Sequence, residues 1–497
     1  MHLEIQARQY VHLKQSKQAK FNLQNWRKYP RLWLRSTATY IVSFFRQSCI
    51  HGLLYLVKNG LTLLEKCLWL MLLCVSFVFC VIIGLQSVDR YKTKSTVVSL
   101  ERDFYYWRTK TAGITICPME RLNVAYFDSF CDTHNIDGQR KTEFFHFLEN
   151  LANSTYTNFD RIPEYNSIDN ILDELQIRPK DYMKLIYNLT GDLTQAKDEE
   201  IRISTQIDNT EIHTRQVLTE WGLCYMVNTV LDLKFTAKYM IYGKIPEEYT
   251  NLDISYTAKD GMYFDNDVTF NFFGFTTPMD MFVHSAYEVM HIDRNFGYFA
   301  VPQDVNVESS PIVTEENFEK RTSISQRKCR FSGESNLEHY PIYTKNMCLQ
   351  ECRLNLAYRL CKCIPHFYPN LIKNPKPVCS YKQLKACFPD KTNYFLEIFR
   401  FQSKHAGFKC ECLQNCYDAN VFISHSFELF GSLGVIVRMK TFPTHRLKRQ
   451  IMFTFTDLLV SIGGTAGLFL GFSVLGAVEI LYYFSLRLMW YLRGYKI

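Results

Sequence analysis

Cysteine is the residue type that carries most of the chemistry in this chain of 497 residues. Of its 17 cysteines, ten crowd between Cys329 and Cys416, with close pairs such as Cys361-x-Cys363. Such spacings suit zinc in a cytosolic protein and disulfides in an oxidising compartment. The choice between metal and disulfide therefore depends on where this segment lies. Spacing alone leaves the pairing open.

Other catalytic side chains do not occur at motif spacing. His284, His291 and His366 are scattered, with no acid or nucleophile at a matching distance. The chain contains no nucleophile elbow, no H-E-x-x-H zinc helix and no phosphate-binding loop. We therefore expect no enzyme, no catalytic residue, no metal site and no cofactor.

A long apolar stretch near the C-terminus, residues 457–486, has one charge after its first residue, Glu479. At about 1.5 Å per residue, 29 helical residues from Leu458 would span roughly 43 Å, against about 30 Å of membrane hydrocarbon. Either the segment tilts strongly or it is interrupted, and we expect an interruption at Gly471-Phe472-Ser473, which requires protein or water around it. Small residues favour close helix packing and backbone carbonyls that face a water-filled path: Gly463, Gly464 and Gly467. A small-residue dimerisation face is the alternative.

A second uncharged run, Cys67 to Leu85, is long enough to span a membrane and lies too far from the N-terminus for a cleaved signal. The net charge of +8 comes entirely from the two flanks, since 43 basic and 46 acidic residues lie between Leu85 and Leu458. Basic flanks stay cytoplasmic and contact anionic lipid, so no nucleic-acid partner is needed. The expected segments are a cytoplasmic part (1–66), helix 1 (67–86), an extracellular part (87–456), helix 2 (457–486) and a short tail (487–497).

An extracellular middle segment favours disulfides over zinc. It reads as mixed helix and strand: a helix over Ile168–Tyr187 that breaks at Pro179, and strands over Phe270–Phe275 and Gly434–Met439. Two sequons lie where glycosylation is possible, at Asn153 and Asn188.

The C-terminal pattern I-G-G-x-x-G-L-F-x-G-x-S-x-L-x-x-x-E resembles the second membrane segment of the degenerin/epithelial sodium channel family, which includes the acid-sensing channels. The ending L-F-L-G-F-S is most similar to the insect pickpocket branch. A second motif agrees, because Ser48, His51 and Gly52 match the S/T-x-x-H-G gating motif of the family. The resemblance implies that this segment folds back beneath the pore.

The resemblance also implies a fold: two membrane helices and a large, disulfide-rich, mixed α/β extracellular domain like that of acid-sensing channels, assembled as a trimer. Matching its cysteine landmarks one by one implies six disulfides: Cys117–Cys224, Cys329–Cys416, Cys348–Cys412, Cys352–Cys410, Cys361–Cys387 and Cys363–Cys379. Cys131 remains over, as a free thiol, an inter-subunit bond or an alternative partner. The chain departs from the family at Thr111-Ala112, where Phe-Pro is usual, and at Pro118, where Asn is usual.

The function implied is a subunit of an amiloride-sensitive-type sodium channel in the plasma membrane, with both termini cytoplasmic, gated through its extracellular domain in sensory or epithelial cells. Gly471, Phe472 and Ser473 would form the selectivity filter and Glu479 would attract cations, unless it pairs with a basic residue or with the polar gating segment. Tyr482 and Tyr483 read as interfacial anchors. Homotrimer, heterotrimer and stimulus stay open. The alternatives are a non-conducting receptor or adhesion protein and a two-span nucleotide-gated channel, which lacks these motifs.

Overall fold

The computed structural model describes residues 30–48, 50–191, 202–205, 214–244, 258–260, 268–273, 278–292, 296–299, 303–398, 409–429 and 434–492. These residues divide into two compact units. The helical unit comes from residues up to 96 and from 451 onward, and the sheet-and-helix unit comes from residues 97–450.

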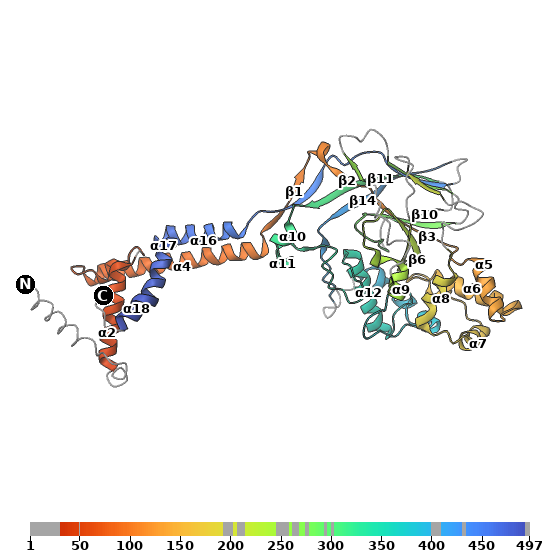
Figure 1. Cartoon of the computed structure of the whole chain (residues 1–497), viewed down its shortest axis with the longest axis horizontal. Helices are drawn as coiled ribbons and strands as arrows, with labels where there is room; N and C mark the ends of the chain where they lie inside the picture. The colour runs from red at the N-terminus through yellow and green to blue at the C-terminus, as the bar shows by residue number, and fades with distance from the viewer. Residues whose placement is uncertain are drawn as a thin grey trace, which may run out of the picture. The chain divides into compact units, whose positions relative to one another are not determined.

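Two long apolar helices lie side by side in the helical unit (Figure 1). Helix α4 (Leu63–Thr93) begins with a capping box between Thr62 and Glu65, which satisfies the first backbone N–H groups. Helix α16 (Phe455–Leu470) begins with a capping box between Thr454 and Asp457. Phe79 of α4 stacks on Phe469 of α16, and the hydroxyls of Ser87 and Ser461 are 2.9 Å apart.

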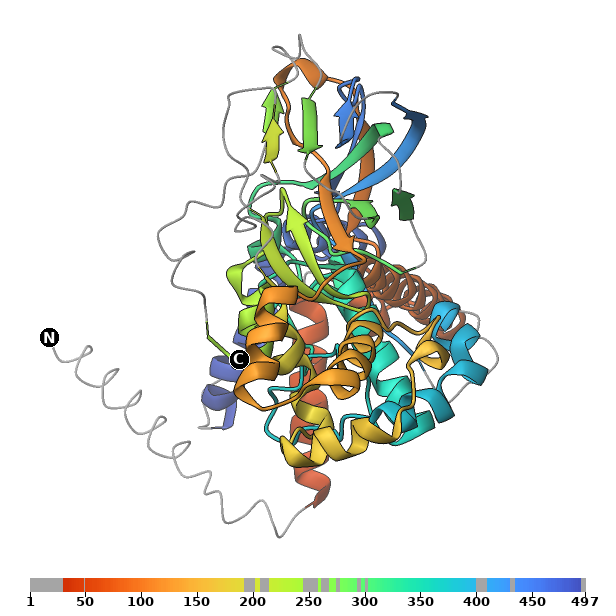
Figure 2. The same cartoon turned by 90° about the vertical axis from the view of Figure 1, so that its right-hand side faces the viewer.

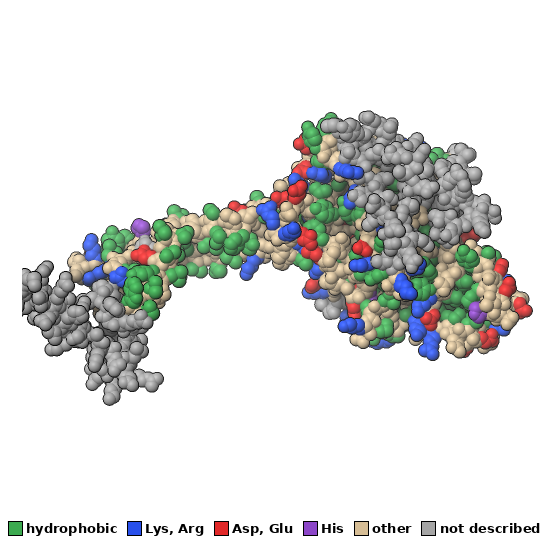
Figure 3. Space-filling view, viewed as in Figure 1, with side chains coloured by type: hydrophobic (Ala, Val, Ile, Leu, Met, Phe, Trp, Pro, Cys, Tyr) green, Lys and Arg blue, Asp and Glu red, His purple; other side chains and the backbone are tan. Residues whose placement is uncertain are grey.

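The second apolar stretch is broken rather than continuous. After α16 come α17 (Val474–Tyr482), a π-helical turn (Tyr483–Arg487) and α18 (Leu488–Leu492), and the two halves are bent by 75°. The unit is completed by α2 (Pro30–Gln47) and the short helix α3 (Leu53–Val57). Figure 3 shows hydrophobic side chains along the surface of α4 and α16, as expected for helices that face lipid.

The helix ends differ from the expected span boundaries. Helix α4 begins four residues before residue 67 and runs seven beyond residue 86. The polar residues at both of its ends are helical too, although they are not part of the apolar run. No residue of its most apolar 18-residue window is buried. The apolar run therefore marks the middle of the helix and not its ends.

Two antiparallel-rich sheets share one core in the sheet-and-helix unit. The first has seven strands: β1 (Thr96–Glu101), β16 (Arg446–Ile451), β11 (Gln303–Thr314), β15 (Gly434–Met439), β8 (Val268–Phe273) and β4 (Arg202–Thr205) in that order, with β14 (Asp418–Glu428) also paired to β11. The second has five, in the order β10 (Phe296–Phe299), β9 (Met279–His284), β3 (Gly113–Pro118), β6 (Gly222–Val227) and β5 (Arg215–Thr219). Ile114 and Val283 of the second sheet pack with Phe272 and Val437 of the first.

Helices gather on the other side of this unit (Figure 2). They pack around a larger core whose aromatic members include Phe144, Tyr156 and Phe367. The helices are α5 (Val124–Thr133), α6 (Gly138–Ala152), α7 (Asn166–Glu174), α8 (Tyr182–Leu189), α9 (Ala237–Tyr242), α12 (Lys345–Cys361), α13 (Tyr381–Cys387) and α14 (Thr392–Leu396). Two short helices, α10 (Phe318–Arg321) and α11 (Ile324–Arg327), lie apart from this group (Figure 1). Short strand pairs join β2 (Arg108–Lys110) to β7 (Ala258–Asp260) and β12 (Cys329–Arg330) to β13 (Gln414–Asn415).

The local expectations from sequence agree with these elements. The helix over Ile168–Tyr187 is interrupted as expected, with a 3-10 turn at Pro179–Asp181 between α7 and α8. Gly434–Met439 forms β15. The strand expected over Phe270–Phe275 starts two residues earlier, and residues 274 and 275 lie outside the described part.

The structure contains the six disulfides that the resemblance implies. They join Cys117 to Cys224, Cys329 to Cys416, Cys348 to Cys412, Cys352 to Cys410, Cys361 to Cys387, and Cys363 to Cys379. Cys348 and Cys352 lie four residues apart on α12, so both point from one face of the helix toward the same partner segment. Cys131 is a buried free thiol, and burial raises its pKa to about 11. It is therefore poorly suited to reaction.

Candidate pore and gating site

The triplet Gly471-Phe472-Ser473 separates α16 from α17, where the break was expected. Gly471 adopts the left-handed conformation (φ +64°), which glycine reaches without the cost that a side chain imposes. Its N–H donates to the Gly467 carbonyl (3.0 Å), and the Phe472 N–H donates to the Ala466 carbonyl (3.3 Å). These two bonds close the end of α16.

Ser473 starts the next helix. Its hydroxyl accepts a hydrogen bond from the Gly476 N–H (3.1 Å), as an N-cap residue does. Between the two caps, the carbonyls of Gly471 and Phe472 accept no hydrogen bond from any described residue. The triplet therefore presents two unpaired backbone oxygens and a hydroxyl in the middle of an apolar segment.

The segment containing His51 and Gly52 contacts this break directly. The His51 N–H donates to the Leu470 carbonyl (3.1 Å), and its ring lies against Gly471 so closely that a Cβ on Gly471 would collide with it. Gly52 also has a positive φ (+96°), and a Cβ there would come within 2.9 Å of the Leu73 side chain of α4. Both glycines are thus required by close approach as well as by backbone conformation.

The remaining residues of the expected site lie around this contact. The Ser48 hydroxyl accepts a hydrogen bond from the Ile50 N–H (3.3 Å) and shapes the turn before His51. On α3, Tyr55 stacks on Trp69 of α4 with ring centroids 4.3 Å apart. Together these contacts hold the segment against α4 and the end of α16.

The glycines of α16 and Glu479 of α17 are not closely packed against other described side chains. A Cβ on Gly463 or Gly464 would meet no atom within 4 Å, and one on Gly467 would meet only the Phe472 carbonyl at 3.5 Å. Glu479, about 9 Å further along the helix than Ser473, is half-buried and forms no ion pair with a described residue. Its alternative role as the partner of a basic residue therefore has no support within this part of the chain.

The interpretation of Tyr483 as an interfacial anchor is wrong. Tyr483 is 3% exposed, because α2 packs on it through Tyr40 and Phe44. The Tyr40 hydroxyl donates to the Tyr483 carbonyl, and the Tyr483 hydroxyl donates to Gln47. The spacing of four residues between Tyr40 and Phe44 places both on one face of α2 but does not indicate which element they contact.

The two sequons differ in accessibility. Asn153 uses its amide nitrogen to donate to the Met119 carbonyl (2.7 Å), and Thr155 of the same sequon is buried. Asn188 is exposed, with its side-chain oxygen accepting from the Tyr242 hydroxyl (2.9 Å). His284 and His366 are buried, and burial lowers the pKa of each to about 4, so both are neutral core residues.

Comparison with known proteins decides the family. Residues 44–483 match the family model for amiloride-sensitive sodium channels, a range that includes both motifs and the whole of the unit between them. The chain belongs to the amiloride-sensitive sodium channel family. It is therefore a member of a membrane ion channel family and not of an enzyme family. Channels of this family assemble as trimers.

Individual relatives point to the same branch. The chain is 23% identical over 467 residues to a sodium channel protein Nach of Drosophila ananassae, covering 90% of this chain and 86% of that relative. It is 22% identical over 481 residues to Pickpocket protein 19 of Drosophila melanogaster, covering 90% of each. A 192-residue part is 26% identical to the Nach protein of Drosophila melanogaster, covering 36% of this chain and 34% of that relative.

Proposed function

We propose that this family member is a pore-forming subunit that conducts Na⁺ across the plasma membrane, with Gly471, Phe472 and Ser473 as its selectivity filter. The observation that carries the proposal is the capped break, which leaves the Gly471 and Phe472 carbonyls without a partner among the described residues. Non-helical backbone at membrane depth persists only beside protein or water. Three subunits would bring six such oxygens and three hydroxyls around one axis, where they replace part of the hydration shell of the ion.

Glu479 supports cation selectivity in this arrangement. An ionisable group inside a membrane segment is costly and is kept for ion pathways or pairing. Because it has no ion-pair partner among the described residues, its charge is available to the pore. Both termini would lie in the cytoplasm and residues 87–456 outside the cell, with the basic flanks on the cytoplasmic side.

His51 and Gly52 support a gating role for the re-entrant segment. The bond from the His51 N–H to the Leu470 carbonyl joins this segment to the last residue before the filter (3.1 Å). A shift of the segment would break that bond and free the Gly471 backbone to move. Gating would then act on filter geometry through one close contact.

Whole-cell current tests the proposal. The chain is expressed alone and with pickpocket or Nach subunits, surface-labelled, and recorded while external Na⁺ is exchanged for a large organic cation, with and without amiloride. The proposal expects an inward Na⁺ current that the organic cation does not carry and that amiloride blocks. Surface-expressed protein that carries no current with any partner would overturn it and favour a non-conducting receptor.

A further inference from the structure

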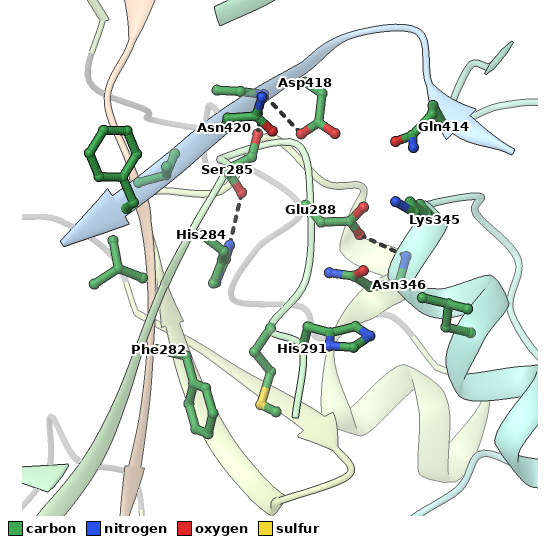
Figure 4. A pocket seen from close by; sticks show the side chains of 16 residues that line it. Phe282, His284, Ser285, Glu288, His291, Lys345, Asn346, Gln414, Asp418 and Asn420 are labelled. Carbon is green, nitrogen blue, oxygen red and sulfur yellow. Dashed lines mark hydrogen bonds between the residues drawn. The ribbon is translucent and has the colours of Figure 1, made fainter. Parts of the chain in front are cut away.

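A cavity of about 420 Å³ lies in the sheet-and-helix unit, far along the chain from the filter residues (Figure 4). It is lined by the end of β9 and the loop after it, the first residues of α12, and the start of β14. This volume lies within the usual range for small-molecule sites. Its apolar lining includes Phe282, Met290 and Leu349, which are almost fully buried.

Two carboxyl groups face this cavity. Glu288 is 6% exposed and accepts hydrogen bonds from the N–H groups of Val289 (3.0 Å) and Asn346 (3.3 Å) and from the Asn415 amide (2.8 Å). Asp418 accepts from the Ala419 N–H (2.8 Å), and the Ser285 hydroxyl also stabilises its carboxylate. Burial, with repulsion from Asp418, raises the pKa of Glu288 to about 7, and burial raises the pKa of Asp418 as well. The positive charges of Lys345 and Arg449 lower the pKa of Asp418, but burial outweighs them.

A positive side chain faces the same space from another element. The Lys345 backbone N–H donates to the Asn415 side chain (2.9 Å). Its ammonium makes no hydrogen bond or direct ion pair with a described residue, and it acts on Asp418 only through a longer-range attraction that lowers the pKa of that carboxyl. The side-chain amides of Gln414 and Asn420 are exposed and likewise have no partner in the described ranges. Figure 4 places Lys345 and Gln414 on one side of the space and Asp418 and Asn420 on another.

His284 adds no charge to this pattern. Both ring nitrogens of His284 are used, one with the Ser285 carbonyl (2.8 Å) and one with the Thr115 hydroxyl (2.7 Å). Burial lowers its pKa to about 4, so its ring is neutral. His291 lies at the lower edge of the cavity in Figure 4, away from Asp418.

The charge pattern selects the class of ligand. No group of three or more His, Cys, Asp or Glu among the described residues could hold a metal ion, which argues against a metal. A simple anion would meet Glu288 and Asp418, and a simple cation would meet Lys345. We propose that this cavity binds a small zwitterion of amino-acid to tripeptide size, with its carboxylate on Lys345 and its ammonium on Asp418. Such a ligand would bridge α12 and β14.

Direct binding to the purified full chain in detergent tests this inference without requiring current. The probes are trialanine, N-acetyl-trialanine, which lacks the ammonium, and trialanine amide, which lacks the carboxylate. Trialanine should bind, and each blocked form should bind about tenfold or more weakly, the usual weight of a hydrogen bond to a charged group. Equal binding of the three probes overturns the inference. So does the absence of binding by alanine, dialanine and trialanine at about 10 mM, a generous limit that corresponds to about −3 kcal/mol.

Two variants locate the ends of the ligand. In Lys345→Met, trialanine and trialanine amide should bind equally, because the carboxylate has lost its partner; in Asp418→Asn, trialanine and N-acetyl-trialanine should bind equally. Lys180→Met, an exposed lysine of the Pro179–Asp181 turn, is the matched control and should bind as the unaltered chain does. If a variant does not fold, the three probes on the unaltered chain still decide. If both variants fold and still bind trialanine more tightly than either blocked form, Lys345 and Asp418 do not hold the two ends of the ligand.

Discussion

Replacing Gly471 with alanine tests the contact between the His51 segment and the filter. Alanine in the left-handed conformation (φ +64°) costs about 1–2 kcal/mol. The new Cβ would also collide with the His51 ring, and residues in direct contact couple by about 0.5–3 kcal/mol. The state with His51 docked should therefore be disfavoured by about 2–4 kcal/mol, which changes the ratio of open to closed channels by at least tenfold.

A double-mutant cycle separates the two causes. His51→Ala removes the collision but not the backbone strain, so the double variant should recover about 1 kcal/mol or more relative to the sum of the single variants. Open probability from single-channel records, at matched surface expression, gives the four corners of the cycle. Gly84→Ala is the control, because this α4 glycine would place its Cβ within 4 Å of no atom. If the effect of the double variant equals the sum of the Gly471→Ala and His51→Ala effects to within about 0.5 kcal/mol, the contact is refuted.

Three further predictions concern the sheet-and-helix unit, each measured by chemical unfolding of the purified chain. Changing both Cys329 and Cys416 to serine should cost about 3 kcal/mol and not the roughly 4–5 that a free loop of 87 residues would give, because Cys348–Cys412 stays bonded inside it and shortens the loop that the bond closes. A loss well above about 4 kcal/mol would contradict this. Glu220→Gln should cost about 3–5 kcal/mol by leaving the fully buried Arg353 charge unpaired, and Arg353→Met in the same chain should restore much of it. A double variant no more stable than Glu220→Gln would show that the pair is not coupled. Glu288 has a folded pKa near 7 against an ordinary value of 4.5, so the folded state holds its proton more tightly and stability should fall by up to about 3 kcal/mol as pH rises from about 4.5 to 7. Glu288→Gln should flatten that slope, and an unchanged slope would assign it to another group.

The break in the second apolar stretch is predicted from its length and its residue types, and the structure contains it at the same place. A run of 29 residues is too long for one span, and Gly471 and Ser473 are suited to end one helix and begin the next. The disulfides are different, since spacing leaves the connectivity open and the pairing came from matching family landmarks. Helix α12 shows why the match holds, because Cys348 and Cys352 share one of its faces.

Other features depend on partners that are distant in the sequence. Tyr40 and Tyr483 are 443 residues apart, so no local pattern indicates that α2 packs on the π-helical turn. The cavity combines residues from near 285, 345 and 418, none of which forms a motif by itself. Such sites arise from chain topology, which periodicity and composition do not determine.

The central claim is that the Gly471–Ser473 break determines which ion passes. The most direct measurement is the reversal potential with Na⁺ outside and K⁺ inside, recorded for Ser473→Ala and Ser473→Thr. Loss of the hydroxyl removes the cap on Gly476 and one oxygen per subunit from the constriction. We expect Ser473→Ala to lower the preference for Na⁺ and Ser473→Thr, which keeps a hydroxyl, to preserve it. Ser485→Ala, whose hydroxyl donates to the Leu481 carbonyl, should leave selectivity unchanged. Unchanged selectivity in Ser473→Ala, with current intact, would contradict the assignment of the filter.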